Sequence, residues 1–202
     1  MVLNRISGVR IAGIASAVPK EFLTIEDDGK VFGKIEMLKV SENTGVKKRH
    51  VATGGMCTSD LFFVDAQRLL KDLDWDPATV DALIFVSQTP DYQLPATACV
   101  LQMRLGLSKN CAAFDVGLGC SGYTYGLWLA ASLIVSGSAK RLILMAGDVS
   151  AGGIPVKDRH VAGLFGDGGS ATAMERDEQA YPITFQMGTD GSGCRAISFC
   201  LL

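Results

Sequence analysis

The sequence has little of what metal, membrane and nucleic-acid proteins usually need. Two histidines accompany six cysteines and no CxxC pair occurs, so no spacing typical of a zinc site is present. No run reaches the roughly 18 apolar residues of a membrane-spanning helix, and no secretory apolar segment opens the chain. The 19 basic and 21 acidic residues are interspersed, without a basic stripe. We therefore expect no metal, no membrane, no nucleic acid, and reduced thiols in the cytoplasm.

Apolar residues make up 48% of the 202 positions, which is enough for a substantial core. Short apolar runs predict strands near residues 9–14, 82–87, 111–116, 141–146, 170–175 and 183–187. Helices are predicted over residues 58–73, capped by Thr58 or Ser59, over 95–105 with Pro95 in the first turn, and over 121–136. A long polar stretch, residues 20–55, separates the first strand from the first helix. This alternation indicates an α/β fold with a sheet that is largely parallel until a final antiparallel pair.

The predicted helix over residues 121–136 is apolar on almost every side. No charged residue occurs from Ser121 through Ala139. A helix that packs on one sheet normally turns a polar face to water, so this helix is expected between two layers. The sequence shows only one sheet, and the second layer is expected to be missing or to come from elsewhere.

Cys120 stands in a glycine-rich turn, Gly-Leu-Gly-Cys-Ser-Gly, between a predicted strand and the apolar helix. A cysteine at a helix N-terminus meets unpaired N–H groups and the positive end of the helix dipole, which stabilise a thiolate. The same N–H groups can receive the oxyanion of a thioester under attack. Taken alone, the turn fits a nucleophile that stores an acyl group and equally a buried structural cysteine.

The same turn also matches the dinucleotide fingerprint G-x-G-x-x-G through Gly117, Gly119 and Gly122. That motif expects an acidic residue at the end of the next strand, and Asp148 stands there. Against this alternative, the motif follows the third strand rather than the first, and a Cys-Ser pair is uncommon in a pyrophosphate loop.

Five ordered segments resemble the ketoacyl synthase III (3-oxoacyl-[acyl-carrier-protein] synthase III) family of the thiolase superfamily. They are ENTGVKKRH, SQTPDYQLPATA, AFDVGLGCSGYTYGL, DRHVAGLFGDGGSA and MGTDGSG. The resemblance covers about residues 8–193 and favours the nucleophile interpretation of Cys120.

The resemblance implies the N-terminal half of a thiolase-like α/β fold, with a mixed, mostly parallel sheet and helices on both faces. Residues 1–176 would form this half, with its nucleophilic cysteine. Residues 177–202 would begin the connection to a C-terminal half that is absent from the sequence. Family members dimerise through the N-terminal half, so a homodimer, or pairing with a homologous half, is expected.

The resemblance also implies the chemistry. Cys120 would accept an acyl group from acyl-coenzyme A or acyl-acyl carrier protein, and malonyl-acyl carrier protein would condense with it and lose carbon dioxide. No tightly bound cofactor is implied. Arg159, Phe165 and Thr44 fall on positions of the acyl and pantetheine tunnel, although Arg159 could form a loop salt bridge and Phe165 a core contact. Asp167 is expected to hold its FGDG turn through bonds to the backbone.

Three departures from the family pattern matter. Lys39 and Asn43 replace the Trp and Arg that grip the adenine end of coenzyme A, and Gly-Leu-Gly replaces an alanine-rich segment before the cysteine. The family's catalytic His and Asn belong to the second half, and neither His160 nor His50 aligns with that His. The 202-residue chain is therefore predicted to be inactive in condensation. Two alternatives stay open: a non-catalytic, truncated partner of a full-length homologue, and a dinucleotide-binding oxidoreductase.

Overall fold

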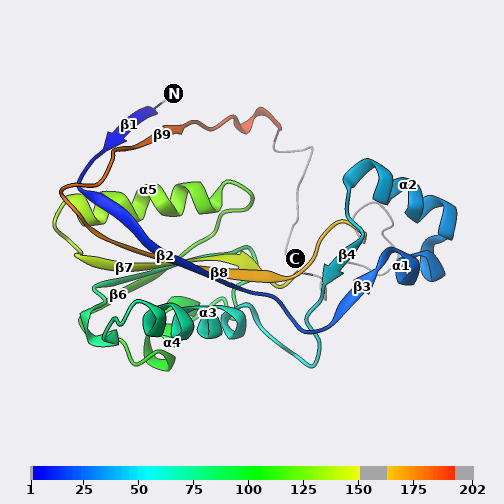
Figure 1. Cartoon of the computed structure of the whole chain (residues 1–202), viewed down its shortest axis with the longest axis horizontal. Coiled ribbons are helices and arrows are strands. Elements are labelled where there is room, and N and C mark those ends of the chain that lie inside the picture. Colours follow the sequence, from blue (N-terminus) through cyan, green and yellow to red (C-terminus); the bar gives the residue numbers. More distant parts are fainter. Residues whose placement is uncertain (1, 151–162, 194–202) are drawn as a thin grey trace.

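The computed structural model describes residues 2–150 and 163–193, and its centre is a five-stranded mixed sheet (Figure 1). The spatial order is β2 (Val9–Ala17), β8 (Gly168–Arg176), β7 (Arg141–Asp148), β5 (Ala82–Val86) and β6 (Ala112–Val116). Strand β5 pairs in parallel with β6 and β7, whereas β8 is antiparallel to both of its neighbours. Only β8 thus runs against the other strands of this sheet, in agreement with a mixed, mostly parallel arrangement.

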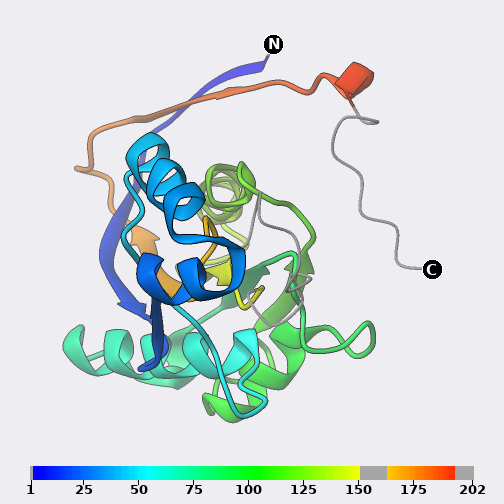
Figure 2. The same cartoon turned by 90° about the vertical axis from the view of Figure 1, so that its right-hand side faces the viewer.

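Helices cover both faces of the sheet, because alternate strand residues point to opposite sides. Helices α3 (Thr58–Asp72) and α4 (Thr97–Arg104) pack against Leu83, Phe85 and Ile143 on one face. Helix α5 (Gly122–Val135) packs against Ile84 and Leu144 on the other face. Figure 2 shows these layers from the side. All five β5 residues are buried, which explains why this strand is a continuous apolar run in the sequence.

The last predicted strand does not pair within the main sheet, contrary to expectation. Strand β9 (Ile183–Met187) instead pairs antiparallel with β1 (Val2–Ile6), which was not predicted. Phe185 and Met187 of β9 are buried in the cluster around α5. The β1–β9 ribbon runs along the side of α5 that faces away from the main sheet (Figures 1 and 2). A second layer over the apolar helix is therefore partly supplied by the chain itself.

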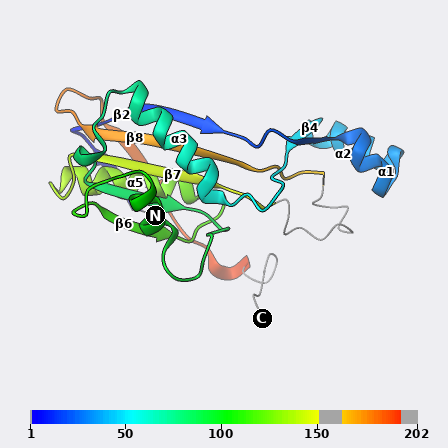
Figure 3. The same cartoon turned by 90° about the horizontal axis from the view of Figure 1, so that it is seen from below.

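The predicted polar stretch contains a small lobe beyond one end of the sheet (Figure 3). Its elements are β3 (Phe22–Thr24), α1 (Ile25–Phe32), α2 (Lys34–Thr44) and β4 (Lys48–His50). Thr24 and Asp27 form a capping box that begins α1. A buried ion pair joins Asp28 of α1 to Arg49 of β4, with 2.6 Å between Oδ1 and Nη2. This pair ties α1 to β4 within the lobe.

Two predicted helix starts shift by a few residues for identifiable reasons. Cys57, not Thr58 or Ser59, is the N-cap of α3, and Asp60 accepts a hydrogen bond from its N–H. The Thr58 hydroxyl instead donates to the carbonyl of Thr89. Helix α4 begins at Thr97 and not at Pro95, since the carboxylate of Asp115 on β6 accepts the N–H groups of Thr97 and Ala98, each at 2.8 Å.

The short 3-10 turns Pro77–Thr79 and Gly191–Gly193 complete the described elements. No helix in the described part of the chain combines the length and apolar character that a membrane crossing requires.

Candidate active site

Cys120 lies in the turn between the end of β6 and the start of α5, as the sequence predicted. Ser121 is the N-cap of α5, and the N–H of Gly122 donates to the carbonyl of Gly119 at 2.7 Å. Cys120 is exposed to solvent. Among the described residues, the backbone N–H groups of Cys120 and Ser121 donate to no acceptor. A thiol and N–H groups without an acceptor in this part of the chain thus stand together at a helix N-terminus, which suits the attack on a thioester.

Two glycines of α5 hold this turn against the sheet. A Cβ on Gly122 would lie 2.6 Å from Cγ1 of Val86, and one on Gly126 would lie 2.6 Å from Cδ1 of Leu144. No real side chain tolerates such distances, so the backbone of α5 lies directly on β5 and β7. This close packing fixes the helix N-terminus at the carboxyl end of β5, the sheet edge where α/β proteins bind their ligands.

A polar network lies beside the turn at the carboxyl ends of β5 and β7. Oδ1 of Asp148 accepts hydrogen bonds from the Ser87 hydroxyl (2.8 Å), the Gln88 N–H (2.7 Å) and the Thr89 hydroxyl (3.3 Å). The N–H of Val149 donates to Oγ1 of Thr89 at 3.0 Å. Sequence reasoning missed this network, although polar residues directly after two buried strands were a usable signal.

The network also bears on the dinucleotide alternative. Asp148 would be the acidic residue that binds the ribose in that interpretation. Its Oδ1 instead holds the loop after β5, and the glycine motif follows β6, a strand at the edge of the sheet. Asp148 is therefore a structural residue of the turn region.

Asp167 joins three segments near the same end of the sheet. Its carboxylate accepts the N–H of Ala52 and the N–H of Ser150, both at 2.7 Å, and its own N–H donates to the carbonyl of His50 at 2.8 Å. The side chain is buried. The carboxylate therefore binds backbone N–H groups, as expected, but those of two neighbouring segments. That it also holds its own FGDG turn stays a prediction.

The structure treats the three tunnel residues differently. Phe165 is 46% exposed, so it is not a core aromatic, and its carbonyl lies 3.5 Å from Nη1 of Arg49. Thr44 ends α2 in the protruding lobe, and its hydroxyl donates to the carbonyl of Val40 within the same helix. Arg159 lies outside the described residues, as does His160. The placement of these residues at Cys120 stays a prediction.

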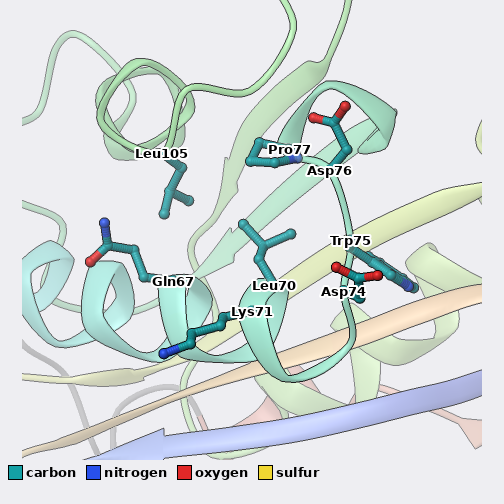
Figure 4. Close-up of a pocket in the computed structure, with 8 residues that line it drawn as sticks. All are labelled: Gln67, Leu70, Lys71, Asp74, Trp75, Asp76, Pro77 and Leu105. Atoms are coloured by element: carbon teal, nitrogen blue, oxygen red, sulfur yellow. The ribbon is translucent and has the colours of Figure 1, made fainter.

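Other features of the described residues lie apart from Cys120. His50 contacts the carbonyl of Pro19 through Nδ1 at 2.7 Å. A shallow hollow between α3 and the loop that follows it is lined by Leu70, Trp75 and Leu105 (Figure 4). Trp75 stacks against Arg141 at the beginning of β7, so the hollow is at the opposite end of the sheet from Cys120. Within residues 2–150 and 163–193, no three metal-binding side chains come together.

Comparison with known proteins places this architecture in a family. A family model described as 3-oxoacyl-[acyl-carrier-protein (ACP)] synthase III matches residues 114–191, which include the Cys120 turn. The solved 3-oxoacyl-(acyl-carrier protein) synthase of Burkholderia xenovorans LB400 superposes with a TM-score of 0.94 at 41% identity, over 96% of this chain and 56% of that chain. The chain belongs to the 3-oxoacyl-[acyl-carrier-protein] synthase III family.

Curated members of the synthase III family agree with this assignment. A beta-ketoacyl-[acyl-carrier-protein] synthase III of Caldanaerobacter subterraneus is 35% identical over 184 residues, covering 91% of this chain and 55% of the relative. A synthase III of Xylella fastidiosa is 35% identical over 183 residues, covering 91% and 56%. The chain spans about half the length of the curated relatives it matches. It has the thiolase-like fold of roughly their N-terminal halves.

Proposed function

We propose that Cys120 is the acyl-accepting nucleophile of a synthase III-type acyltransferase. The observation that carries this proposal is the exposed thiol at the start of α5, beside the N–H groups of Cys120 and Ser121, which have no acceptor in residues 2–150 and 163–193. In the proposed step the thiolate attacks the carbonyl carbon of an acyl thioester. A new carbon–sulfur bond forms, the bond to the donor sulfur breaks, and the donor leaves as a thiol after taking up a proton. A free thiol of this kind persists in a reducing compartment such as the cytoplasm.

The second half-reaction is proposed for the complete protein rather than for this chain. Malonyl carried on acyl carrier protein would lose carbon dioxide, and the resulting carbanion would attack the acyl group on Cys120. The developing enolate needs hydrogen-bond donors. The resemblance assigns that task to a His and an Asn of a second half, and His50, the one histidine among the described residues, is engaged with Pro19. The proposed substrates are thus acyl thioesters, the proposed partner is acyl carrier protein, and no tightly bound cofactor is needed.

A non-catalytic role as half of a larger assembly is the second candidate. It is favoured by helix α5, whose large apolar residues Leu127, Trp128 and Leu133 stay only half-buried in this chain. Such a face suits a second layer from another chain or another half. This candidate and the nucleophile proposal differ in whether Cys120 takes up an acyl group.

The test is acyl transfer to the 202-residue protein. Folded protein is incubated with short acyl thioesters of coenzyme A and of acyl carrier protein, and peptide mass spectrometry locates the added acyl mass. We expect the acyl group on Cys120 and none after Cys120→Ser, while Cys99→Ser, an exposed thiol elsewhere, leaves the modification unchanged. Acylation spread evenly over the exposed cysteines, or absent from Cys120, would argue for the non-catalytic role.

A further inference from the structure

Gln88 lies against the turn that carries Cys120. A Cβ on Gly119 would stand 2.9 Å from Nε2 of Gln88 and 3.0 Å from both Cδ and Oε1. The amide therefore occupies the space that any larger residue at position 119 would fill. Gly119 has no positive φ, so its backbone does not require glycine. A Cβ at this position would displace the end of the flexible Gln88 side chain.

Hydrogen bonds of the main chain fix the position of Gln88. It follows β5, the central strand, and its N–H donates to Oδ1 of Asp148 at 2.7 Å. The preceding residue, Ser87, is buried and donates to the same oxygen at 2.8 Å. These bonds fix the backbone of Gln88 beside the Cys120 turn. Its side-chain torsions leave the amide able to turn toward a bound group.

The amide of Gln88 is also free to bind a ligand. In residues 2–150 and 163–193, neither its two N–H donors nor its carbonyl oxygen has a hydrogen-bond partner. The residue is exposed, as Cys120 is. An amide offers both donors and acceptors, and this one stands against Gly119, the residue directly before Cys120.

We propose that Gln88 is a specificity-determining residue of the acyl site, and that its amide selects acyl groups with a hydroxyl or oxo oxygen close to the thioester over plain alkyl chains. This rests on the proposed function of Cys120. An alkyl chain laid on the amide would exclude water without replacing its hydrogen bonds, whereas an oxygenated chain would replace them.

Disulfide exchange tests this preference without acyl transfer. The protein is equilibrated with equal concentrations of bis(2-hydroxyethyl) disulfide, dipropyl disulfide and their thiols. The Cys120 thiolate attacks either disulfide, one S–S bond replaces another, and one thiol leaves. In the hydroxyethyl adduct the oxygen is four bonds from Sγ, as in a 3-hydroxyacyl thioester. Peptide mass spectrometry gives the ratio of the two adducts, normalised to the ratio on glutathione in the same mixture.

We expect the hydroxyethyl adduct to be favoured on Cys120 by about 2- to 10-fold, the range that one neutral hydrogen bond contributes. Gln88→Leu, apolar and of similar size, should bring the ratio to about one. Gly119→Ala should do the same with Gln88 intact, because the new methyl group displaces the amide. Cys99, an exposed thiol on α4, should show no preference in any of these proteins.

Two results would overturn the proposal: a wild-type ratio of one, or a preference that persists in both variants. Gly119→Ala keeps the experiment decisive if Gln88→Leu fails to fold. It removes the amide from the turn by changing Gly119 and not Gln88. The disulfide and acyl-transfer experiments can fail independently. If the hydroxyethyl adduct is favoured but Cys120 accepts no acyl group from any thioester, the proposed acyl transfer is wrong and the contact of Gln88 with a group on Cys120 is still supported.

Discussion

Gly126 of α5 lies directly against Leu144 of β7, with no space for a methyl group between them. A Cβ at this position would also stand 3.1 Å from Cγ2 of Val86. The contact belongs to the close packing that sets the Cys120 turn on the carboxyl end of β5. It gives the first prediction.

Gly126→Ala should destabilise the protein by about 1–2 kcal/mol. Overpacking of a dense core costs about 1–3 kcal/mol, and the better helix propensity of alanine offsets up to about 1 kcal/mol. Thermal unfolding followed by circular dichroism measures the change. Gly117→Ala is the matched control, because nothing lies within 4 Å of its added Cβ and its φ is not positive. Equal stability of the two variants would contradict the close approach of α5 to the sheet.

Cys120 should be the most reactive of the protein's thiols. Burial raises the pKa of Cys111 to about 11, and burial, with Asp91 and Asp60 nearby, raises the pKa of Cys57. Cys120 is exposed at the start of a helix. Limiting iodoacetamide at neutral pH, read by peptide mass spectrometry, should label Cys120 first. Preferential labelling of Cys57 or Cys194 in folded protein would count against the turn geometry.

Asp65 should make stability fall as pH rises from about 4 to 6. It is 2% exposed in α3, its Oδ2 has no hydrogen-bond partner among the described groups, and burial raises its pKa to about 6, partly opposed by the Ala17 N–H and by Arg68. The unfolded carboxyl has the ordinary value of 3.8. Between these values the folded state holds a proton that the unfolded state has lost, so the free energy of unfolding decreases with pH.

The expected loss is on the order of 2–3 kcal/mol from pH 4 to pH 7. Asp65→Asn should remove that part of the pH dependence in urea titrations at several pH values. Asp72→Asn, an exposed position of the same helix that also pairs with Arg68, should leave it in place. An unchanged pH profile in Asp65→Asn would show that another group causes it.

The sequence predicts those elements that depend on residues close together in the chain, and it misses those that depend on distant ones. Strands such as β5 and β7 follow from short apolar runs, and the turn at Cys120 follows from its glycines. The pairing of β9 with β1 joins residues more than 170 positions apart, such as Ile6 and Ile183, and no local pattern encodes it. Helix α2 was missed because it buries only Met37.

In the candidate site, too, features set by neighbouring residues were predicted and features set by distant residues were not. Cys120 was found from its own neighbours in sequence. The contact of Gln88 with Gly119 and the bonds of Asp148 to the loop after β5 required the strands to be placed side by side. The sequence shows a glycine at position 119, but only the structure shows that its φ is not positive and that the Gln88 amide lies against it.

The apolar helix α5 leads to the last prediction, which concerns association. Gly126, Ala130 and Ile134 are buried and face the sheet, so Trp128 and Val135 lie on the opposite side at helical spacing. The β1–β9 ribbon covers this side only in part, and Val135 remains 48% exposed. Full burial of a large apolar side chain is worth about 1.5–3 kcal/mol. Val135 and the partly exposed Trp128 thus leave apolar area whose burial in an interface would favour association.

The 202-residue protein should therefore self-associate, or aggregate, at micromolar concentration. Sedimentation equilibrium measures the association constant. Val135→Lys, which places a charge on the open face of α5, should weaken association by at least about tenfold. Val64→Lys is the matched control, since Val64 is 56% exposed on α3 at the other face of the sheet. A monodisperse wild-type monomer with a sharp cooperative melt would mean that α5 needs no further cover, and an equal effect of both substitutions would place the contact elsewhere.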